Sequence, residues 1–343
     1  MNKVPVSLVA GFLGAGKTTL LNRILNGRHG RRIGVLVNDF GEINIDAELI
    51  TRVEGETISL TNGCVCCSIR DDLVEALEQL LAQAPCPEMI VVETSGVSDP
   101  KAAAMAIVMS TRLAEATQLD AIITVIDASE LLELDELNAK LAQDQIEVAD
   151  IAIINKIDLA GSATSEQVSR HIRKISSKSR IIEAVHADVS LELLLGLSLH
   201  EDRTFAMTGT TAGSHGHESH GHADHTHAYT AYSWQSDAPL EFESAYGAFQ
   251  SLPLSVFRCK GILQLREVPD KQVILQMTGK RVTLAKGAPW HEMTPSSRIV
   301  AISAAGKLDS GDLDRRFESC VSHGTASDAN PITQAVIEIL RRP

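Results

Sequence analysis

Short apolar runs alternate with amphipathic stretches through the first half of the chain. The runs occupy residues 5–9, 33–37, 89–92, 121–126 and 151–154, and apolar residues at helical spacing fill the intervals between them. Runs of this length predict buried strands, and strands that alternate with helices pair in parallel. We therefore expect an α/β fold in which one parallel sheet has helices on both faces.

The pattern changes sharply after residue 205. Gly, Ser, Thr, Ala and six histidines dominate residues 208–228 and offer no large aliphatic side chain to a core, a composition typical of a flexible linker. Strand-like runs beyond it, closed by a helical pattern, predict a smaller C-terminal α+β domain. The expected organisation is an α/β domain at 1–205, a linker at 206–229, an α+β domain at 230–322 and a tail at 323–343.

The charge balance limits the choice of partners. Acidic residues outnumber basic ones by 44 to 31, which gives the 343-residue chain a formal net charge of −13. This charge repels phosphate backbones and anionic bilayers, so neither nucleic acid nor a membrane is an expected partner. The early apolar stretch at 4–15 contains glycines and runs directly into Gly16 and Lys17, which indicates a buried strand and not a signal or membrane segment. We expect a cytoplasmic protein.

A glycine-rich motif directly follows the first predicted strand. Residues 11–18, GFLGAGKT, fit the P-loop pattern GxxxxGK[ST], and a helical pattern begins at once after them. Glycines let backbone N–H groups face phosphates, Lys17 supplies a charge for the β- and γ-phosphate oxygens, and the Thr18 hydroxyl can bind Mg²⁺. The motif predicts a P-loop NTPase sheet and a nucleotide site at Gly11, Gly14, Ala15, Gly16, Lys17, Thr18 and Thr19.

A carboxylate stands at the end of the run at 89–92. Glu93 closes this run and Gly96 follows three residues later. In a parallel sheet the tip of this strand lies beside the P-loop, where Mg²⁺ or its bound water is held. The expected catalytic residues are Lys17 and Glu93.

An NKxD motif follows the last run and selects the base. Asp158 can accept two N–H donors from the guanine edge, which adenine lacks in that arrangement, and the Lys156 stem covers the base plane. With Asn155 this motif predicts GTP as the nucleotide, hydrolysed slowly. The sequence identifies neither a residue that orients the attacking water nor an arginine finger.

Three cysteines crowd into the segment GCVCC, just before a helical pattern at 71–81, and we expect this segment to be a strand-to-helix loop. Thiolates are soft ligands for zinc, Cu(I) or iron–sulfur clusters, and three of them within four residues can converge on one ion. Because closed zinc sites use four ligands, water, a carboxylate, histidine or a client would fill the fourth position, which suits transfer. A redox pair and inert loop cysteines are the alternatives. The expected metal ligands are Cys64, Cys66 and Cys67.

With GCVCC between the P-loop and Glu93, the chain resembles the CobW family of P-loop GTPases over most of its length. Segment 38–46, NDFGEINID, is similar to the family's N-E-F-G-E-x-G-I-D, although Asp39 and Asn44 stand where the family commonly has Glu and Gly. The resemblance also covers the histidine-rich linker and the RCKG sequence in the C-terminal domain. It implies a metallochaperone or metal-insertion factor, and it adds Glu42 to Thr18 and Glu93 as an expected Mg²⁺ ligand.

The resemblance also implies a mechanism. GTP and Mg²⁺ would order segment 38–46 and position the cysteine loop for metal, and hydrolysis would release the ion to a client metalloprotein. The linker histidines could collect metal weakly on a flexible arm, or could simply be solvated. These histidines are His215, His217, His220, His222, His225 and His227.

Several alternatives stay open. The CxCC motif does not distinguish Zn²⁺ from Co²⁺, so a cobalt-insertion factor for cobalamin or nitrile hydratase competes with a zinc chaperone. A metal storage or sensing protein regulated by nucleotide is a further reading. The sequence does not name the client, leaves a homo-oligomer open, and suggests the C-terminal domain only as a docking surface.

Overall fold

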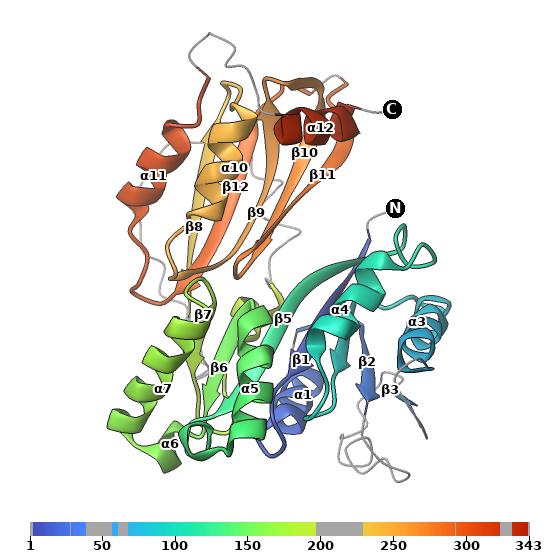
Figure 1. Cartoon of the computed structure of the whole chain (residues 1–343). Coiled ribbons are helices and arrows are strands. Elements are labelled where there is room, and N and C mark those ends of the chain that lie inside the picture. The colour runs from blue at the N-terminus through green and yellow to red at the C-terminus, as the bar shows by residue number, and fades with distance from the viewer. Residues whose placement is uncertain are drawn as a thin grey trace, which may run out of the picture.

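The computed structural model of the chain describes residues 3–27, 29–38, 57–60, 68–196, 229–291, 293–322 and 331–341. Two β-sheets, each with its own helices, lie end to end (Figure 1). Of the linker predicted at 206–229, the structure describes only Tyr229, where the first strand of the second sheet begins. The other linker residues lie outside the described residues.

The first sheet has seven strands in the order β3-β2-β4-β1-β5-β6-β7, and every neighbouring pair is parallel. Each of the five apolar runs lies in one of these strands, so the predicted α/β fold is confirmed. The other two strands, β3 and β7, are four residues long and carry too few apolar residues to form a recognisable run. The strands are β1 Val4–Ala10, β2 Ile33–Asn38, β3 Thr57–Leu60, β4 Met89–Glu93, β5 Thr117–Asp127, β6 Ile151–Asn155 and β7 Arg180–Glu183.

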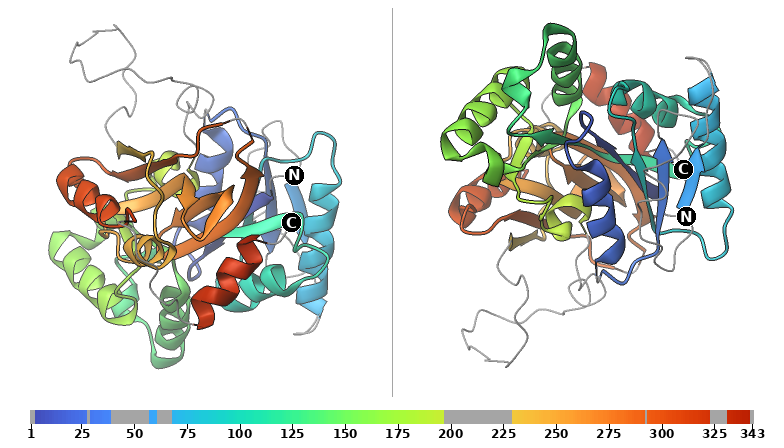
Figure 2. Two further views of the ribbon diagram at one scale, coloured as in Figure 1. Left: turned by 90° about the horizontal axis from the view of Figure 1, so that it is seen from above. Right: turned by 90° about the horizontal axis from the view of Figure 1, so that it is seen from below.

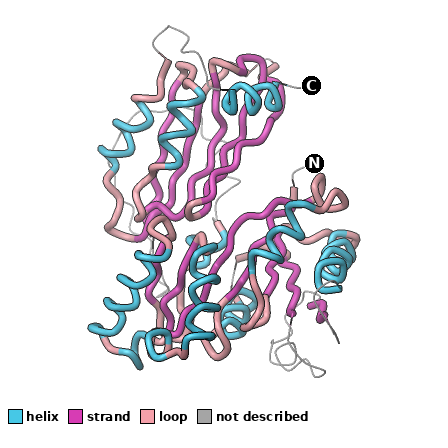
Figure 3. Tube along the Cα trace, viewed as in Figure 1, coloured by secondary structure: helices cyan, strands magenta, loops and turns pink. Residues whose placement is uncertain are grey.

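Helices cover both faces of this sheet (Figures 2 and 3). Successive strand side chains point to opposite faces, so Val9 packs with α1 and α8 while Leu8 packs with α3 and α4. Farther along the second face, α5 and α7 bury Ile126 and Ile154. The helices are α1 Lys17–Asn26, α3 Ser68–Leu81, α4 Pro100–Met109, η1 Leu131–Glu133, α5 Glu136–Val148, α6 Ile157–Ala160, α7 Ser162–Ile175 and α8 Leu191–Leu195.

The second sheet has five antiparallel strands in the order β11-β10-β9-β12-β8. Three helices share one core with it, in which Phe249 and Phe317 are fully buried, and this confirms the predicted α+β domain. The helix in the predicted tail joins this core through Ile337 and Leu340. The elements are β8 Tyr229–Ser236, α10 Phe242–Gln250, β9 Val256–Leu265, β10 Val268–Thr278, β11 Arg281–Pro289, β12 Ser297–Ala304, α11 Ser310–Glu318 and α12 Pro331–Arg341.

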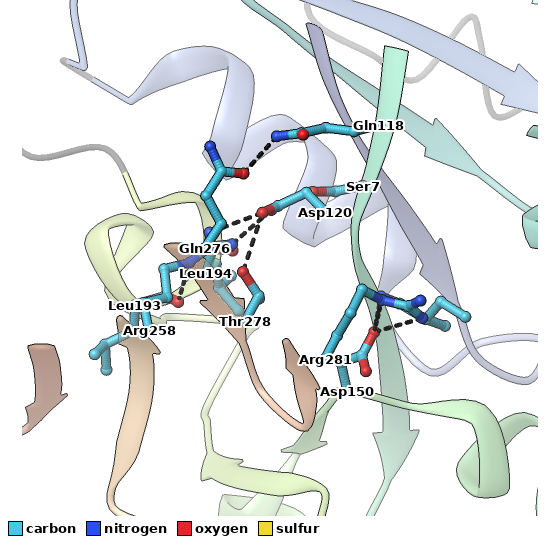
Figure 4. A network of polar contacts seen from close by, with 11 residues as sticks. Ser7, Gln118, Asp120, Asp150, Leu193, Leu194, Arg258, Gln276, Thr278 and Arg281 are labelled. Atoms are coloured by element: carbon cyan, nitrogen blue, oxygen red, sulfur yellow. Dashed lines mark hydrogen bonds and ion pairs between the residues drawn. The ribbon is translucent and has the colours of Figure 1, made fainter. Parts of the chain in front are cut away.

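A buried polar network joins the two sheets (Figure 4). Arg258 of β9 pairs with Asp120 of β5 through Nη2–Oδ2 and Nη1–Oδ1 contacts of 2.8 and 3.1 Å, and Thr278 donates to the same carboxylate at 3.0 Å. Burial alone would raise the pKa of Asp120, but the charge of Arg258 and the hydrogen bonds from Arg258 and Thr278 outweigh it and hold the pKa below its usual value. Nearby, Arg281 reaches the buried Asp150 at 3.2 Å. The contact between the domains therefore includes paired charges, beside the apolar packing of Phe257 against the core of the first domain.

Membrane-spanning helices are absent from the described ranges. No helix there combines the length and the hydrophobicity that crossing a bilayer requires.

Candidate nucleotide site

The loop between β1 and α1 has a backbone that only glycine tolerates. Gly11, Gly14 and Gly16 have φ of +140°, +75° and +108°. A Cβ on Gly11 would lie 2.1 Å from the Val125 carbonyl oxygen, and one on Gly16 would lie 2.4 Å from Asn155 Nδ2. Both positive φ and close packing therefore exclude larger residues, and the loop closes tightly over β5 and β6.

This loop leads directly into the N-terminus of α1. Gly16 is the N-cap of this helix and supplies no side-chain hydrogen bond, so the first-turn N–H groups lack a side-chain acceptor at the cap. Such a helix end favours anions. Thr18, half-buried, and Thr19, exposed, lie in this first turn. The geometry fits phosphate at the place that the P-loop motif predicts.

Lys17 lies folded against the loop. Its side chain is buried, and Nζ donates to the Phe12 carbonyl oxygen at 3.3 Å. A phosphate oxygen would accept a stronger, charge-assisted hydrogen bond than this carbonyl does. The ammonium is thus held at the loop, within a side chain's reach of bound phosphates.

Asn155 ties three segments together. Its Nδ2 donates to the Ala15 carbonyl oxygen at 2.8 Å, and its Oδ1 accepts from the Ala187 N–H at 2.7 Å. The side chain is buried beneath the P-loop, so it anchors this loop to β6 and to the segment after β7. Whether Asn155 also contacts the base, as its motif predicts, stays a prediction.

Lys156 is held by a carboxylate that the sequence reasoning did not single out. Lys156 has a left-handed backbone, with φ of 60°, and its Nζ lies 2.6 Å from Oδ2 of the buried Asp127 at the tip of β5. Ser129 donates to the other oxygen through N–H and Oγ at 2.9 and 2.6 Å. The sequence does show that Asp127 directly follows the apolar run at 121–126, as Glu93 follows the run at 89–92. Asp127 therefore orients the lysine of the NKxD motif.

Electrostatics keep Asp127 charged. Burial works to raise the pKa of Asp127, but hydrogen bonds from Lys156 and Ser129 outweigh it, so the pKa lies below its usual value. Two residues beyond Lys156, Asp158 is exposed on α6. One lysine is thus fixed at the sheet edge, and one carboxylate is open to an incoming base.

Glu93 and Gly96 lie next to the P-loop. Glu93 is buried at the end of β4, opposite Val9 of β1 in the sheet register. A Cβ on Gly96 would lie 2.8 Å from the Leu13 backbone nitrogen, so the segment after β4 comes close to the P-loop. This is the neighbourhood predicted for Mg²⁺.

Gln145 is a second polar residue that the sequence reasoning missed. It is buried on α5, and its Nε2 donates to the carbonyl oxygens of Gly96 and Ser98 at 3.1 and 3.2 Å. Only the tertiary structure reveals this role, because a single glutamine in an amphipathic helix carries no motif. Gln145 fixes the position of the loop that follows Glu93.

Apart from Thr18 and Glu93, the predicted metal ligands fall outside the described ranges. These are Cys64, Cys66, Cys67, Glu42 and the six linker histidines, and the segment 61–67 joins β3 to α3 in the chain. Where the structure does describe the chain, no group of three or more His, Cys, Asp or Glu side chains is placed to hold a metal ion. Predictions about the thiol site therefore remain predictions.

The three cysteines within the described residues form no disulfide. Cys86 is exposed, whereas Cys259 and Cys320 are buried, and all three are free. Burial raises the pKa of Cys259 and of Cys320, which keeps both as neutral thiols.

Comparison with known proteins places both domains in one family. The model for the CobW/HypB/UreG nucleotide-binding domain matches residues 5–183, and that for the cobalamin synthesis protein cobW C-terminal domain matches residues 229–321. The zinc chaperone YjiA of Escherichia coli is 30% identical over 88% of this chain and 94% of its own length. The crystal structure of its Zn(II)-bound form gives a TM-score of 0.43 at 25% identity, covering 94% of this chain and 100% of that one.

Two further relatives match over somewhat more than half of the chain. The zinc chaperone CobW of Sinorhizobium sp is 31% identical over 60% of this chain, and the match spans 65% of that protein. The zinc-regulated GTPase metalloprotein activator 1 of Schizosaccharomyces pombe is 36% identical over 54% of this chain and 47% of its own length. The family match over more than half of the chain, with a relative aligned along most of it, shows that this protein belongs to the CobW/HypB/UreG family and carries its nucleotide-binding domain.

Proposed function

We propose that the chain is a GTP-hydrolysing metallochaperone that binds zinc at Cys64, Cys66 and Cys67 and delivers it to a client metalloprotein. The observation that carries the proposal is the glycine cradle beside Lys17, found in a chain whose relatives are named zinc chaperones. A third relative is named a zinc-regulated GTPase metalloprotein activator, which supports both hydrolysis and a client.

Guanine selection follows from the arrangement around Lys156. The ion pair with Asp127 holds the lysine in one position, so its aliphatic stem can cover the base without losing side-chain freedom on binding. Asp158, exposed two residues later, would accept the two N–H donors of guanine. Adenine cannot satisfy that carboxylate in the same pose, and ATP is therefore rejected.

The phosphates would rest on the P-loop. Backbone N–H groups and the end of α1 bind the oxygens, and Lys17 exchanges its contact with the Phe12 carbonyl for a phosphate oxygen. Oxygen donors at Thr18 and Glu93 suit Mg²⁺, and Glu42 would complete the set. Bound there, the ion would neutralise charge on the β- and γ-phosphate oxygens.

Zinc is the cargo in this account. Three thiolates in one loop match the soft ligands that zinc prefers, and one position left to a client allows exchange. The zinc-named relatives favour zinc over cobalt. The histidine arm would bind the ion more weakly, because a flexible segment loses conformational entropy on chelation.

Communication between the two ligands would run through the loop after Glu93. Gln145 and the close approach at Gly96 hold this loop against the P-loop and α5. Loss of the γ-phosphate would therefore shift the position of this loop. By linkage, GTP and zinc must then strengthen each other's binding by the same factor.

One observation supports cobalt as the metal that the protein delivers. The family model that matches the C-terminal domain is named after a cobalamin synthesis protein, so insertion of cobalt is the second candidate function. Co²⁺ accepts the same tetrahedral thiolate environment as Zn²⁺.

Nucleotide competition tests the GTPase half of the proposal. We expect GTP and GDP to displace a fluorescent guanine nucleotide at least about 100-fold better than ATP and ADP do. Asp158→Ala should abolish this preference, whereas Lys17→Ala should reduce phosphate release without changing base preference. Equal affinity for GTP and ATP would refute the guanine assignment.

A further inference from the structure

An open groove of about 410 Å³ lies beside α4, away from the nucleotide site. Three large apolar side chains line it from the exposed side of α4: Met105, Val108 and Met109, which are 52%, 57% and 63% exposed. Leu119 and Ile122 of β5 also line the groove. Methionine is common at protein-binding surfaces because its unbranched side chain adapts to its partner. An apolar stripe of this kind marks an interaction surface.

Basic side chains line the same groove. Lys101 is exposed on the first turn of α4, while Lys280 and Arg281 enter from the β10–β11 turn of the second domain. Lys280 donates to the Glu147 carbonyl oxygen at 2.7 Å, and Arg281 pairs with Asp150. Glu147 is the one acidic lining residue, and Asp150 behind the groove pairs with Arg281, so three cations face two carboxylates and the groove keeps a positive balance. In a chain with net charge −13, this groove suits an acidic, apolar occupant.

The chain itself presents such an occupant. At η1 and the start of α5, Leu132 is 39% exposed and Leu137 is 80% exposed. Exposed acidic residues surround the two leucines on this short ridge: Glu130, Glu133, Asp135 and Glu136. We call residues 130–137 the acidic ridge. Its composition complements that of the groove in both charge and hydrophobicity.

The ridge and the groove are spaced for reciprocal contact. Leu137 and the groove-lining Val148 are eleven residues apart on α5, which is three helical turns, so they lie on the same side of this helix. The separation along the axis is about 16 Å. The helices that carry them, α4 and α5, lie on the same face of the sheet (Figure 1). A two-fold axis across the middle of α5 would bring each ridge to the other copy's groove.

We propose that a second copy of this chain docks here, with the acidic ridge of each protomer seated in the α4 groove of the other. The two contacts are identical, so the arrangement closes as a dimer and does not propagate into a filament. The α5 helices run antiparallel across the axis, and Leu137 meets the region of Met109 and Val148. This dimer requires neither nucleotide nor metal, and so stands apart from the proposed function.

Substituting opposite charges at Met109 of the groove and Leu137 of the ridge tests the arrangement. We would measure mass against concentration by sedimentation velocity for the full chain and for Met109→Glu, Leu137→Lys and the double variant. Met109→Glu repels the ridge and Leu137→Lys repels the groove, so each should weaken dimerisation at least about tenfold. The double variant, and a mixture of the two single variants, should restore it.

Matched controls separate this effect from damage to the fold. Met293 is 51% exposed and Leu254 is 40% exposed, and both lie in the second domain away from groove and ridge. Met293→Glu and Leu254→Lys should dimerise as the unmodified chain does. All variants should keep its thermal unfolding transition, because each alters an exposed side chain.

Three results would overturn the proposal. One is a chain that stays monomeric at every concentration up to about 300 μM, roughly where a dimer of modest affinity would form. Another is a dimer that both single variants leave intact. The third is that the single variants lose dimerisation and neither the mixture nor the double variant recovers it. This result would show that the acidic ridge does not contact the α4 groove.

Discussion

Arg258 of the second domain forms a bidentate ion pair with Asp120 of β5. The same strand ends at Asp127, which pairs with Lys156. Arg258 also donates to the carbonyl oxygens of Leu193 and Leu194 after β7. One buried guanidinium therefore fixes the second domain to both β5 and α8. The strand that carries the interface at one end supports the nucleotide site at the other.

Removal of one partner of this pair should destabilise the protein strongly. Arg258→Ala leaves the Asp120 carboxylate, whose side chain is 9% exposed, without its cation, which we expect to cost about 3–5 kcal/mol of unfolding free energy. Denaturant titration measures the change. The Asp120→Asn and Arg258→Gln pair serves as a double-mutant cycle, and a coupling energy near zero would show that the two side chains act independently.

The pH dependence of stability should have opposite signs at the two interface carboxylates. The pKa of Asp120 is lowered, so its contribution is present above the unfolded-state pKa of about 4 and is lost as pH falls through the folded value. Burial raises the pKa of Asp150 despite Arg281, so its contribution is present at low pH and is lost as pH rises through the folded value.

Unfolding free energies measured between about pH 3 and pH 8 test this contrast. Asp120→Asn should remove stability mainly at the neutral end, whereas Asp150→Asn should remove the part that declines as pH rises. Identical pH profiles for the two variants would contradict the assignment.

The P-loop should not accept a methyl group at Gly16. Gly16→Ala places a Cβ against Asn155 Nδ2 at a backbone angle that L-residues rarely adopt, and we expect at least about a 100-fold loss of GDP affinity. Gly30→Ala is the matched control, since it has a positive φ of +64° with no atom within 4 Å. Equal nucleotide affinity in the two variants would show that the cradle tolerates side chains.

Asp127 should matter for guanine binding although it need not touch the base. Asp127→Asn removes the charge that holds Lys156, and we expect about tenfold weaker binding of GDP with a smaller effect on a bare phosphate ligand such as pyrophosphate. Ser129→Ala, which leaves the ion pair in place, should have a smaller effect. Isothermal titration of each ligand measures the difference, and equal losses for GDP and pyrophosphate would place the role of Asp127 at the phosphates.

Much of this fold can be read from local pattern. Apolar runs such as 121–126 mark central strands because both faces of a parallel sheet are buried, and GFLGAGKT marks the P-loop because its backbone requires glycine. Gln145 could not be identified in this way, and for Asp127 the sequence shows only that a carboxylate closes the run at 121–126. Their partners, Lys156 and the Gly96 carbonyl, come from other elements, and only the folded chain brings them together. Likewise, nothing in the local sequence pairs Arg258 with Asp120 across 138 positions.

The most direct test of the central claim is the affinity for Zn²⁺ in two nucleotide states. The titration would use a chromophoric chelator as competitor, once with Mg²⁺ and a non-hydrolysable GTP analogue and once with Mg²⁺ and GDP, alongside a variant with Cys64, Cys66 and Cys67 replaced by Ser. We predict binding about 5–150-fold tighter in the GTP form and loss of that difference in the variant. Equal zinc affinity in both nucleotide states would contradict a metallochaperone gated by GTP.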